Sequence, residues 1–169
     1  IDFAAFIALF PQLIAGPVLR YKDLADQFTY RTHTMEKFGE GAFRFMQGFI
    51  KKVFIADSIA PLADSAFALS DPSTADAWLG ILAYTAQLYF DFSGYSDMAI
   101  GLGLMMGFRF NENFNQPYIS QSITEFWRRW HISLSTWLRD YLYIPLGGNR
   151  NSTVKTYRNL LLTMLLGGL

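Results

Sequence analysis

His131 is the residue of this chain whose type and surroundings best suit chemistry. It lies in an aromatic and basic stretch that contains Trp127, Arg128, Arg129 and Trp130. An imidazole is the side chain best able to move protons near neutral pH, because it titrates between about pH 5 and 8. Residue types alone leave two interpretations open: a proton-transfer group, or a structural histidine held by hydrogen bonds.

Other kinds of site fit the sequence poorly. A serine hydrolase built from Ser135, His131 and Asp140 would need the acid to orient the imidazole, but Asp140 follows too far along one predicted helix. A metal site is equally weak, since the chain has 2 histidines, far apart in sequence, and 0 cysteines. Gly101 and Gly103 lack a preceding strand, so they indicate close helix packing rather than a phosphate-binding loop.

Two carboxylates interrupt the longest apolar region. Asp91 and Asp97 need a polar cavity or a cationic partner there, because an unpaired carboxylate in an apolar environment costs several kcal/mol. Arg128 and Arg129 are candidate partners for these acids, and a phosphorylated ligand is the alternative partner for the arginines. A second interpretation is that the helix ends near Phe92 and that Asp97 caps another helix at a surface.

The stretch from Ser122 to Tyr141 is predicted to form one helix that holds His131. Ser122 and Glu125 stand at the two positions of a capping box, and Pro145 follows the end of the helix. Nearly every face of such a helix is bulky or apolar, so we expect protein or lipid around it. Helical spacing places four side chains on one face: Trp127, His131, Ser135 and Leu138.

The N-terminal third combines an apolar run with an amphipathic helix. Residues 3–19 carry no charge but contain Pro11 and Pro17, which favour either a broken or re-entrant segment or a short helix followed by a turn. Residues 20–37 are predicted to be a polar connection. Residues 35–69 show helical periodicity, so we expect an amphipathic helix whose Lys51 and Lys52 reach lipid headgroups and which kinks or ends at Pro61.

The rest of the chain alternates helices and loops. Ser73 and Asp76 predict the cap of a long apolar helix over residues 77–108, in which Gly94 invites a break. Residues 109–121 and 145–155 are predicted to be folded loops, and another apolar helix starts at Leu160. The fold class expected from these elements is all-α, a multi-span helical membrane protein fragment with kinked, re-entrant and amphipathic helices.

Composition supports a membrane protein. Of 169 residues, 17% are charged and 17% aromatic, and the mean hydropathy is +0.17, whereas about 25% of residues in soluble domains are charged. The formal net charge of zero gives no field to recruit nucleic acid. Both ends lie inside apolar runs, so residues 1–169 are interpreted as an internal part of a single membrane domain, truncated at both ends.

Several motifs in the same order carry a family resemblance that runs over essentially the whole chain. They are Tyr-Phe-Asp-Phe-Ser-Gly-Tyr-Ser-Asp at 89–97, Phe-Asn-Gln-Pro-Tyr at 114–118, and residues 126–148 with Trp-Arg-Arg-Trp-His and Trp-Leu-Arg-Asp-Tyr-Leu-Tyr-Ile-Pro-Leu-Gly-Gly. Together they resemble the membrane-bound O-acyltransferase (MBOAT) family. The likeness is greatest to the bacterial branch that acetylates alginate, which is related to the D-alanyl transferases of teichoic acid.

The resemblance implies a tunnel through the membrane in which an acyl group from a cytoplasmic donor meets an acceptor from the other side. His131 is then the first of two polar catalytic residues. The second, a histidine in a Trp-His pair, is expected just past Leu169, so the fragment alone is expected to be inactive. Arg128 and Arg129 would receive the donor's phosphates. The further substrate and tunnel candidates are Trp127, Trp130, Ser135, Asp91, Asp97 and Asp140.

The expected function is therefore transfer of acetyl or other acyl groups toward hydroxyls of an exported polysaccharide, with alginate as the expected acceptor. No bound cofactor or metal is expected; the donor is a substrate such as acetyl-CoA or an acyl carrier. The expected location is the bacterial inner membrane, with several crossings. Partners would be the bilayer, other membrane or periplasmic polysaccharide-acetylation proteins, and the polysaccharide itself, directly or through a relay, but no nucleic acid. A membrane transporter or channel and a non-catalytic membrane scaffold are the alternatives.

Overall fold

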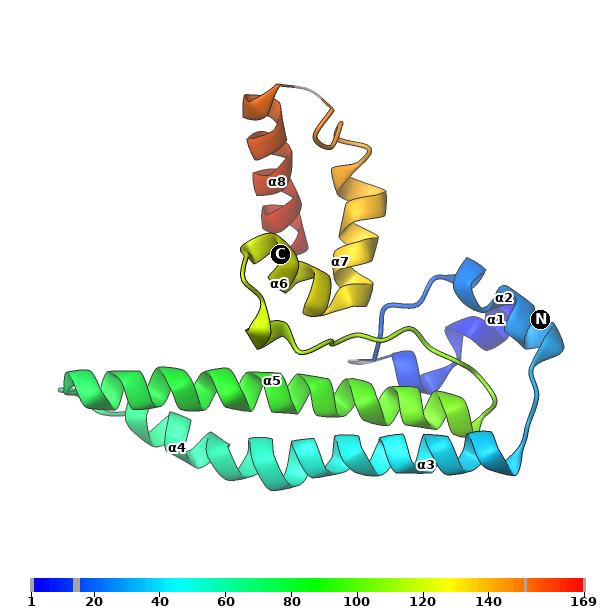
Figure 1. Ribbon diagram of the computed structural model, residues 1–169, viewed down its shortest axis with the longest axis horizontal. Helices are drawn as coiled ribbons and strands as arrows, with labels where there is room; N and C mark the ends of the chain where they lie inside the picture. The colour runs from blue at the N-terminus through cyan, green and yellow to red at the C-terminus, as the bar shows by residue number, and fades with distance from the viewer. Residues whose placement is uncertain (1, 14–15, 151, 169) are drawn as a thin grey trace. The chain divides into compact units, whose positions relative to one another are not determined.

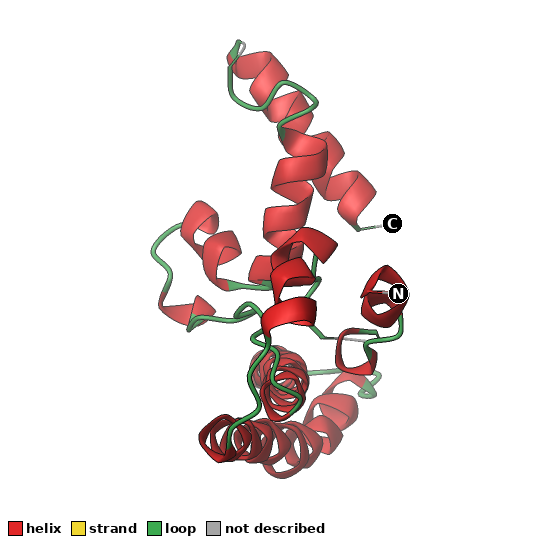
Figure 2. Cartoon of the chain, turned by 90° about the vertical axis from the view of Figure 1, so that its right-hand side faces the viewer, coloured by secondary structure: helices red, strands yellow, loops and turns green. Residues whose placement is uncertain are grey.

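The computed structural model describes residues 2–13, 16–150 and 152–168, which divide into two compact units, unit 1 (Ile1–Asn111) and unit 2 (Glu112–Leu169). Within the described residues every regular element is a helix, as Figure 2 shows, so the predicted all-α class is confirmed. None of these described helices combines the length and the hydropathy required to cross a bilayer.

Unit 1 begins with short helices (Figure 1). α1 (Asp2–Ile7) is followed by one 3-10 turn, η1 (Phe10–Gln12), whose first turn contains Pro11. This is the predicted short helix followed by a turn; Ile14 and Ala15, in the same run, lie outside the described residues. α2 (Tyr21–Tyr30) replaces the predicted polar connection, because one side of this polar helix buries Leu24 almost completely.

A long rod follows, made of α3 (Met35–Phe49), the π-helix η2 (Ile50–Ala56) and α4 (Asp57–Phe67) without interruption. Thr34 caps its start by accepting a hydrogen bond from the Lys37 N–H. Pro61 lies inside α4, and the helix continues to Phe67. The rod therefore does not end at the proline.

α5 (Thr74–Met105) runs antiparallel along this rod for 32 residues (Figure 1). Its predicted capping box is confirmed: the Ser73 Oγ accepts from the Asp76 N–H, and the Asp76 carboxylate accepts from the Ser73 N–H. Gly107, with φ +84°, ends it in a Schellman motif. The predictions of a break at Gly94 and of a helix end near Phe92 are both wrong.

Glycines allow α5 to continue through Gly94 in close contact with the rod. A Cβ on Gly94 would lie 2.7 Å from the Gly48 carbonyl oxygen, and one on Gly101 would lie 2.6 Å from that of Gly41. Cβ atoms on Gly41 and Gly48 would meet the backbone of α5 just as closely. These glycines therefore allow two helix backbones to touch, which confirms the packing interpretation of Gly101.

The buried small residues of the rod keep facing α5 along its whole length, and the π-helix makes this possible. Gly41, Gly48, Ala56 and Ala63 are all buried and are separated by seven, eight and seven residues. In an α-helix each added residue turns the chain by about 100°, so the eighth residue would move Ala56 off the contact face. The wider turn of η2 absorbs that residue.

Apolar side chains close the other end of unit 1. The buried cluster contains Leu9, Leu19, Leu24, Ile100, Phe108 and Phe110. Its members come from the N-terminal segments and from the end of α5 with the chain that follows it. Phe28 and Phe108 add a tilted ring contact with centroids 5.0 Å apart. The cluster therefore joins the first thirty residues to the α5 helix.

Unit 2 contains η3 (Pro117–Ile119), α6 (Ile123–Arg129), α7 (Ile132–Leu138), the π-helix η4 (Arg139–Tyr143) and α8 (Thr153–Gly167). The single helix predicted over residues 122–141 is wrong, because the chain breaks between α6 and α7. α8 begins at Thr153, earlier than the predicted Leu160. It packs on η4, and a Cβ on its Gly167 would lie 2.9 Å from the Cδ1 of Leu138, the last residue of α7.

Candidate functional site

His131 lies at the α6–α7 junction, formed by Trp130 and His131. Trp130 is extended (φ −102°, ψ 127°), and His131 adopts the left-handed conformation (φ 43°, ψ 54°) that non-glycine residues rarely take. The conformation ends α6 and starts α7 in a new direction. Trp127, His131, Ser135 and Leu138 therefore do not share one helix face, and that prediction is wrong.

A loop residue, Asn113, holds the junction in place. Asn113 is 0% exposed, and its Oδ1 lies 2.9 Å from the His131 Nδ1. The same oxygen accepts hydrogen bonds from the Ser133 Oγ at 2.8 Å and from the Ser133 N–H at 3.3 Å. Backbone hydrogen bonds run alongside, from Ile132 N–H to the Asn113 carbonyl and from Asn115 N–H to the Arg129 carbonyl, both 2.9 Å. Side chain and backbone thus fix the histidine together.

This contact determines which ring nitrogen carries the proton. A backbone N–H can only donate, so the Asn113 atom that accepts from Ser133 must be the oxygen. An amide oxygen only accepts, so the His131 Nδ1 must donate to it. In a neutral imidazole the basic lone pair is then on Nε2.

The surroundings also keep His131 uncharged. Burial lowers the pKa of His131 from its ordinary 6.5 to about 4, because desolvation disfavours the imidazolium. At neutral pH the ring is therefore neutral. A neutral imidazole with a fixed tautomer can accept a proton at Nε2 while it keeps the proton on Nδ1.

Aromatic rings surround the junction. The Phe126 and Trp130 rings stack at 5.6 Å, Phe114 meets Trp130 edge-on at 5.1 Å, and Phe114 stacks on the His131 ring at 6.5 Å. Tyr118 contacts Phe126 and Trp130 at 6.4 and 6.2 Å. Among these contacts the Phe114 ring packs directly against the imidazole and contributes to its desolvation.

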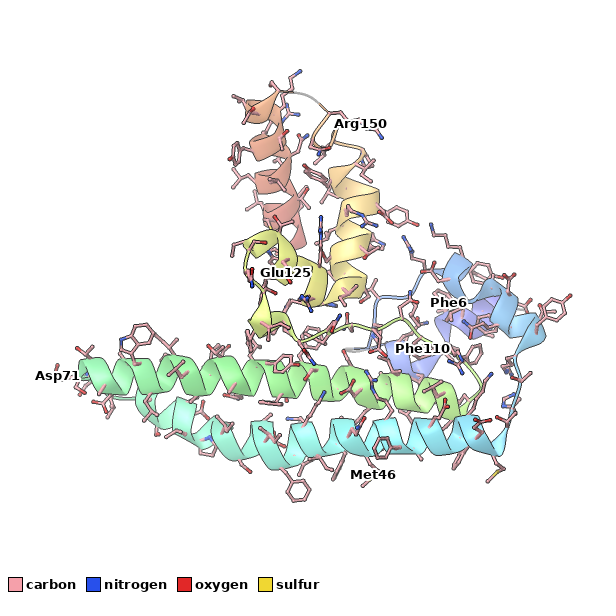
Figure 3. All side chains as sticks on the ribbon, in the orientation of Figure 1. Phe6, Met46, Asp71, Phe110, Glu125 and Arg150 are labelled. Carbon is pink, nitrogen blue, oxygen red and sulfur yellow. The ribbon has the colours of Figure 1, made fainter. Side chains whose placement is uncertain are left out.

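The arginines of α6 have partners within unit 2. Arg129 pairs with Glu125 at 3.0 Å and donates to the Asn115 carbonyl at 3.2 Å. The Gln121 N–H and then Arg129 lower the pKa of Glu125. This glutamate bonds to Gln121 rather than to the Ser122 N–H, so only the Ser122 half of the predicted capping box forms. Figure 3 labels Glu125 at the start of α6.

The two interrupting acids of α5, Asp91 and Asp97, have their cationic partners on the rod. Asp97, whose side chain is 9% exposed, pairs with Arg44 at 2.7 Å and with Lys51 at 2.6 Å. These three residues line an open cavity of about 360 Å³ together with Gln47 and Ile50. The prediction that Asp97 faces a cavity or an arginine is confirmed, although the arginine is Arg44 and not Arg128 or Arg129.

Asp91 is more exposed, at 47% of its side chain, and pairs with Lys52 at 2.7 Å. Lys52 also pairs with Asp57 at 2.6 Å, and these two carboxylates raise the pKa of the lysine. The lysines predicted to reach lipid headgroups thus make ion pairs with α5 and α4. Met46, labelled in Figure 3, instead points away from α5 and is exposed.

The remaining candidates do not assemble a hydrolase. Asp140 pairs with its neighbour Arg139 at 2.9 Å, and Ser135 donates its backbone N–H to the His131 carbonyl. The residue that orients the His131 ring is Asn113, not Asp140. Within the described ranges no group of three or more histidine, cysteine or acidic side chains is placed to hold a metal ion.

Sequence reasoning did not predict that five residues would hold His131 or pair with the acids of α5. These residues are Asn113, Ser133, Arg44, Lys51 and Lys52. Asn113 was recognised only as part of an amide-rich loop, because a continuous helix gave His131 no reason to meet that loop. Two features of the sequence could have predicted the ion pairs of the lysines: Asp57 lies close to them in sequence, and the next helix contains two acids.

Comparison with known proteins gives one family over the entire chain. The model of MBOAT, the membrane-bound O-acyltransferase family, matches residues 1–169. The chain is 83% identical over 169 residues to the probable alginate O-acetylase AlgI of Azotobacter vinelandii. The alignment covers 100% of this chain and 34% of that protein. The identity to the probable alginate O-acetylase AlgI of Pseudomonas aeruginosa is also 83%, over 100% of this chain and 32% of the relative.

More distant relatives are named for other polymers, peptidoglycan and teichoic acid. The chain is 48% identical over 172 residues to the peptidoglycan O-acetyltransferase of Helicobacter pylori, covering 99% of this chain and 33% of that protein. It is 36% identical over 148 residues to the teichoic acid D-alanyltransferase of Bacillus subtilis, covering 82% and 36%. The chain thus spans about a third of the length of these curated relatives.

Proposed function

We propose, since this chain belongs to the membrane-bound O-acyltransferase family, that the full-length protein transfers acyl groups to hydroxyls of an exported polysaccharide. The names of its relatives support an acetyl group as the cargo and alginate as the polymer, because identity to the two alginate O-acetylases is 83%. The other two named relatives modify peptidoglycan and teichoic acid, which supports an acceptor outside the cytoplasm.

The observation that carries the proposal is the state of His131. Asn113 holds the ring, the backbone of His131 is in a strained left-handed conformation, and the ring packs against Phe114 and is neutral at pH 7. A purely structural histidine needs no left-handed backbone, whereas strained conformations of this kind concentrate at active sites. We therefore assign His131 the role of the proton-transfer group.

The proposed reaction balances around one proton. The Nε2 of His131 accepts the proton of the acceptor hydroxyl, and the hydroxyl oxygen forms a C–O bond with the acyl carbonyl of a thioester donor. The donor C–S bond breaks, and the proton passes from Nε2 to the leaving sulfur. Acetyl-CoA and a thioester-linked acyl carrier are both suitable donors. Exclusion of water from the aromatic site protects the activated acyl group.

As a member of this family the protein is a membrane protein. We place the full-length chain in the bacterial inner membrane with several crossings, because a cytoplasmic donor and an exported acceptor require a path through the bilayer. The exposed apolar side chains along the rod and α5, such as Phe43, Phe54, Trp78 and Leu82, support contact with lipid or with other segments of the protein.

Arg128 is the side chain that we propose to receive a donor phosphate. It is exposed in the last turn of α6, while Arg129 is engaged by Glu125. Arginine suits phosphate through paired N–H donors. Partners are proposed to be periplasmic polysaccharide-acetylation proteins, which accept the acyl group directly or relay it to the polymer.

The test is the O-acetyl content of the polymer in cells that produce the full-length protein. His131→Ala and His131→Gln are expected to lower acyl transfer per protein molecule by about 10²- to 10⁴-fold. His33→Ala is the matched control, because His33 is exposed and hydrogen bonds to the Arg31 side chain. Normal polymer acetylation by both His131 variants would refute the proposal. Ion or substrate flux without acyl turnover would favour the transporter alternative instead.

A further inference from the structure

We propose that Asn113 is a positioning residue for the acyl-transfer step: its side-chain oxygen fixes the tautomer and the direction of the His131 ring. The inference rests on the proposed function, because it assigns Asn113 a task only if His131 moves a proton. It adds to that function a residue from a loop outside the histidine's own helices.

Three hydrogen-bond donors converge on one atom of Asn113. The His131 Nδ1, the Ser133 Oγ and the Ser133 N–H all lie within 3.3 Å of the Asn113 Oδ1. Because the residue is 0% exposed, water cannot replace these bonds if the oxygen is removed. The oxygen therefore holds the ring and the first turn of α7 with the same contacts.

Asn113 also couples the His131 ring to the backbone around it. His131 adopts a left-handed φ of 43°, which requires support from its surroundings. The Asn113 carbonyl accepts from the Ile132 N–H at 2.9 Å, so the same residue also fixes the backbone just after the histidine. Ring direction and backbone direction are consequently set by one loop residue.

The residue at position 113 is an amide and not a carboxylate, and this difference affects the charge of the ring. An aspartate at position 113 would accept the same hydrogen bonds, but its negative charge would stabilise the imidazolium. The amide oxygen holds the Nδ1 proton without adding charge, so Nε2 remains the basic nitrogen of a neutral ring. The charged residues on the elements that meet around this ring are Glu112, Glu125, Arg128, Arg129, Arg139 and Asp140.

Unit 2 supplies a matched control in Asn159. It is also 0% exposed, and its Nδ2 donates to the Gly148 carbonyl at 3.0 Å while its Oδ1 accepts from Arg158. Asn159 makes none of the contacts to His131 described above. Equivalent substitutions at 113 and 159 thus remove one buried amide each, and only the first touches the histidine.

The experiment compares Asn113→Leu, Asn113→Asp, Asn159→Leu and Asn159→Asp in full-length protein reconstituted in lipid nanodiscs. The readouts are the folded fraction, kcat and KM per folded molecule with acetyl-CoA as the probe donor, and the ¹⁵N chemical shifts of labelled histidine. Asn113→Leu is expected to lower kcat by about 10²-fold with little change in KM, because the ring samples the wrong tautomer. Both Asn159 variants are expected to lower the folded fraction and to leave kcat per folded molecule unchanged.

Asn113→Asp separates positioning from folding if the leucine variant does not fold. It is expected to fold, to retain more activity than Asn113→Leu, and to move the acidic limb of the kcat profile to higher pH. Its ¹⁵N spectrum should still show a proton on Nδ1. A kcat within twofold of the wild type in a folded Asn113→Leu protein, or an unshifted acidic limb in Asn113→Asp, would overturn the inference.

The outcomes also separate this inference from the proposed function. If His131→Ala is inactive and the Asn113 variants behave like the Asn159 variants, only the positioning role fails. If His131→Ala is fully active, the proposed function itself fails, whatever the Asn113 variants do.

Discussion

Each unit holds an ionisable side chain, Asp97 buried in unit 1 and His131 partly buried in unit 2, and the two units keep these groups in opposite charge states. In unit 1 the carboxylate of Asp97 is surrounded by two cations, Arg44 and Lys51. In unit 2 the imidazole of His131 is bonded to a neutral amide, and burial keeps it uncharged. The ion pairs of Asp97 hold the rod and α5 together. A neutral imidazole beside an amide can instead accept a proton.

This difference separates scaffold from chemistry. The ion pairs of unit 1 join the rod to α5 at the place where Gly48 and Gly94 bring the backbones together. Substitutions there are expected to change how much protein folds. Substitutions around His131 are expected to change how fast each folded molecule turns over. The following predictions test whether the two regions divide in this way.

The largest effect is expected at the helix contact. Leucine in Gly94→Leu would drive its Cβ to 2.7 Å from the Gly48 carbonyl and to 3.1 Å from the Lys51 Cβ, so the helices must separate. We expect a loss of about 3 kcal/mol or more in the free energy of unfolding. Gly39→Leu is the control, because a Cβ there meets nothing within 4 Å. Thermal stability by fluorescence-detected size exclusion measures both, and equal stability of the two variants would contradict the close contact.

The next effect is expected at the buried acid. Asp97→Leu removes the shared partner of Arg44 and Lys51, and we expect a cost of about 2 kcal/mol, below the range for fully buried pairs because both cations are about one third exposed. Asp91→Leu removes a partner whose side chain is 47% exposed, so its cost should stay below about 1 kcal/mol. Turnover per folded molecule should be preserved in Asp97→Leu. A folded but inactive variant would place Asp97 in the chemistry and break the division between the units.

A pH dependence is expected from unit 2. His131 has a folded pKa of about 4 against an ordinary 6.5, so the unfolded chain binds its proton at higher pH than the folded one. The contribution of this ring to stability is therefore complete above about pH 6.5 and is lost as the pH falls toward 4. His131→Gln should show a shallower decrease in melting temperature across this window. Identical slopes in variant and wild type would mean that the ring is accessible to protons in the folded protein.

The smallest effect is expected at the start of α5, remote from both buried groups. Ser73→Ala removes the Oγ that accepts from the Asp76 N–H, and the exposed cap should contribute only about 0.5 kcal/mol. The Ser73 contacts lower the pKa of Asp76, so the cap should weaken as the pH falls through that carboxylate's titration. Amide hydrogen exchange over the first turn of α5 measures the change. Faster exchange near α3 as well would show that the cap stabilises more than its own turn.

Local signals in the sequence were sufficient for the start of α5 and for the packing role of Gly101. The Ser73 and Asp76 cap, the loop around Asn113 and the packing role of Gly101 all depend on residues close in sequence or on side-chain size. The break at His131 could not be predicted in this way. No glycine or proline stands there, and the conformation is stabilised by a hydrogen-bond partner eighteen residues earlier in the chain.

The same limit applies to the ion pairs. Lys51 and Asp97 are 46 residues apart, and their pairing depends on the antiparallel register of α3 and α5. The sequence indicated that Asp97 needed a polar or cationic partner, and Arg128 and Arg129 were the candidates considered. The rod carries four cations, Lys37, Arg44, Lys51 and Lys52, and only the helix register decides which of them reach the acid. Burial of Leu24 by a polar segment likewise depends on neighbours that no periodicity shows.

The π-helix η2 has a consequence for which lengths of the rod can fold. Its seven-eight-seven pattern of small residues behaves as a regular heptad pattern with one inserted position between Gly48 and Ala56. A homologue shorter by one residue in this segment would restore an ordinary α-helix and keep every small residue against α5. In this chain the π-helix also carries two consecutive lysines, Lys51 and Lys52, which pair with different acids of α5, Asp97 and Asp91. The extra residue is thus dispensable for the contact between the two backbones.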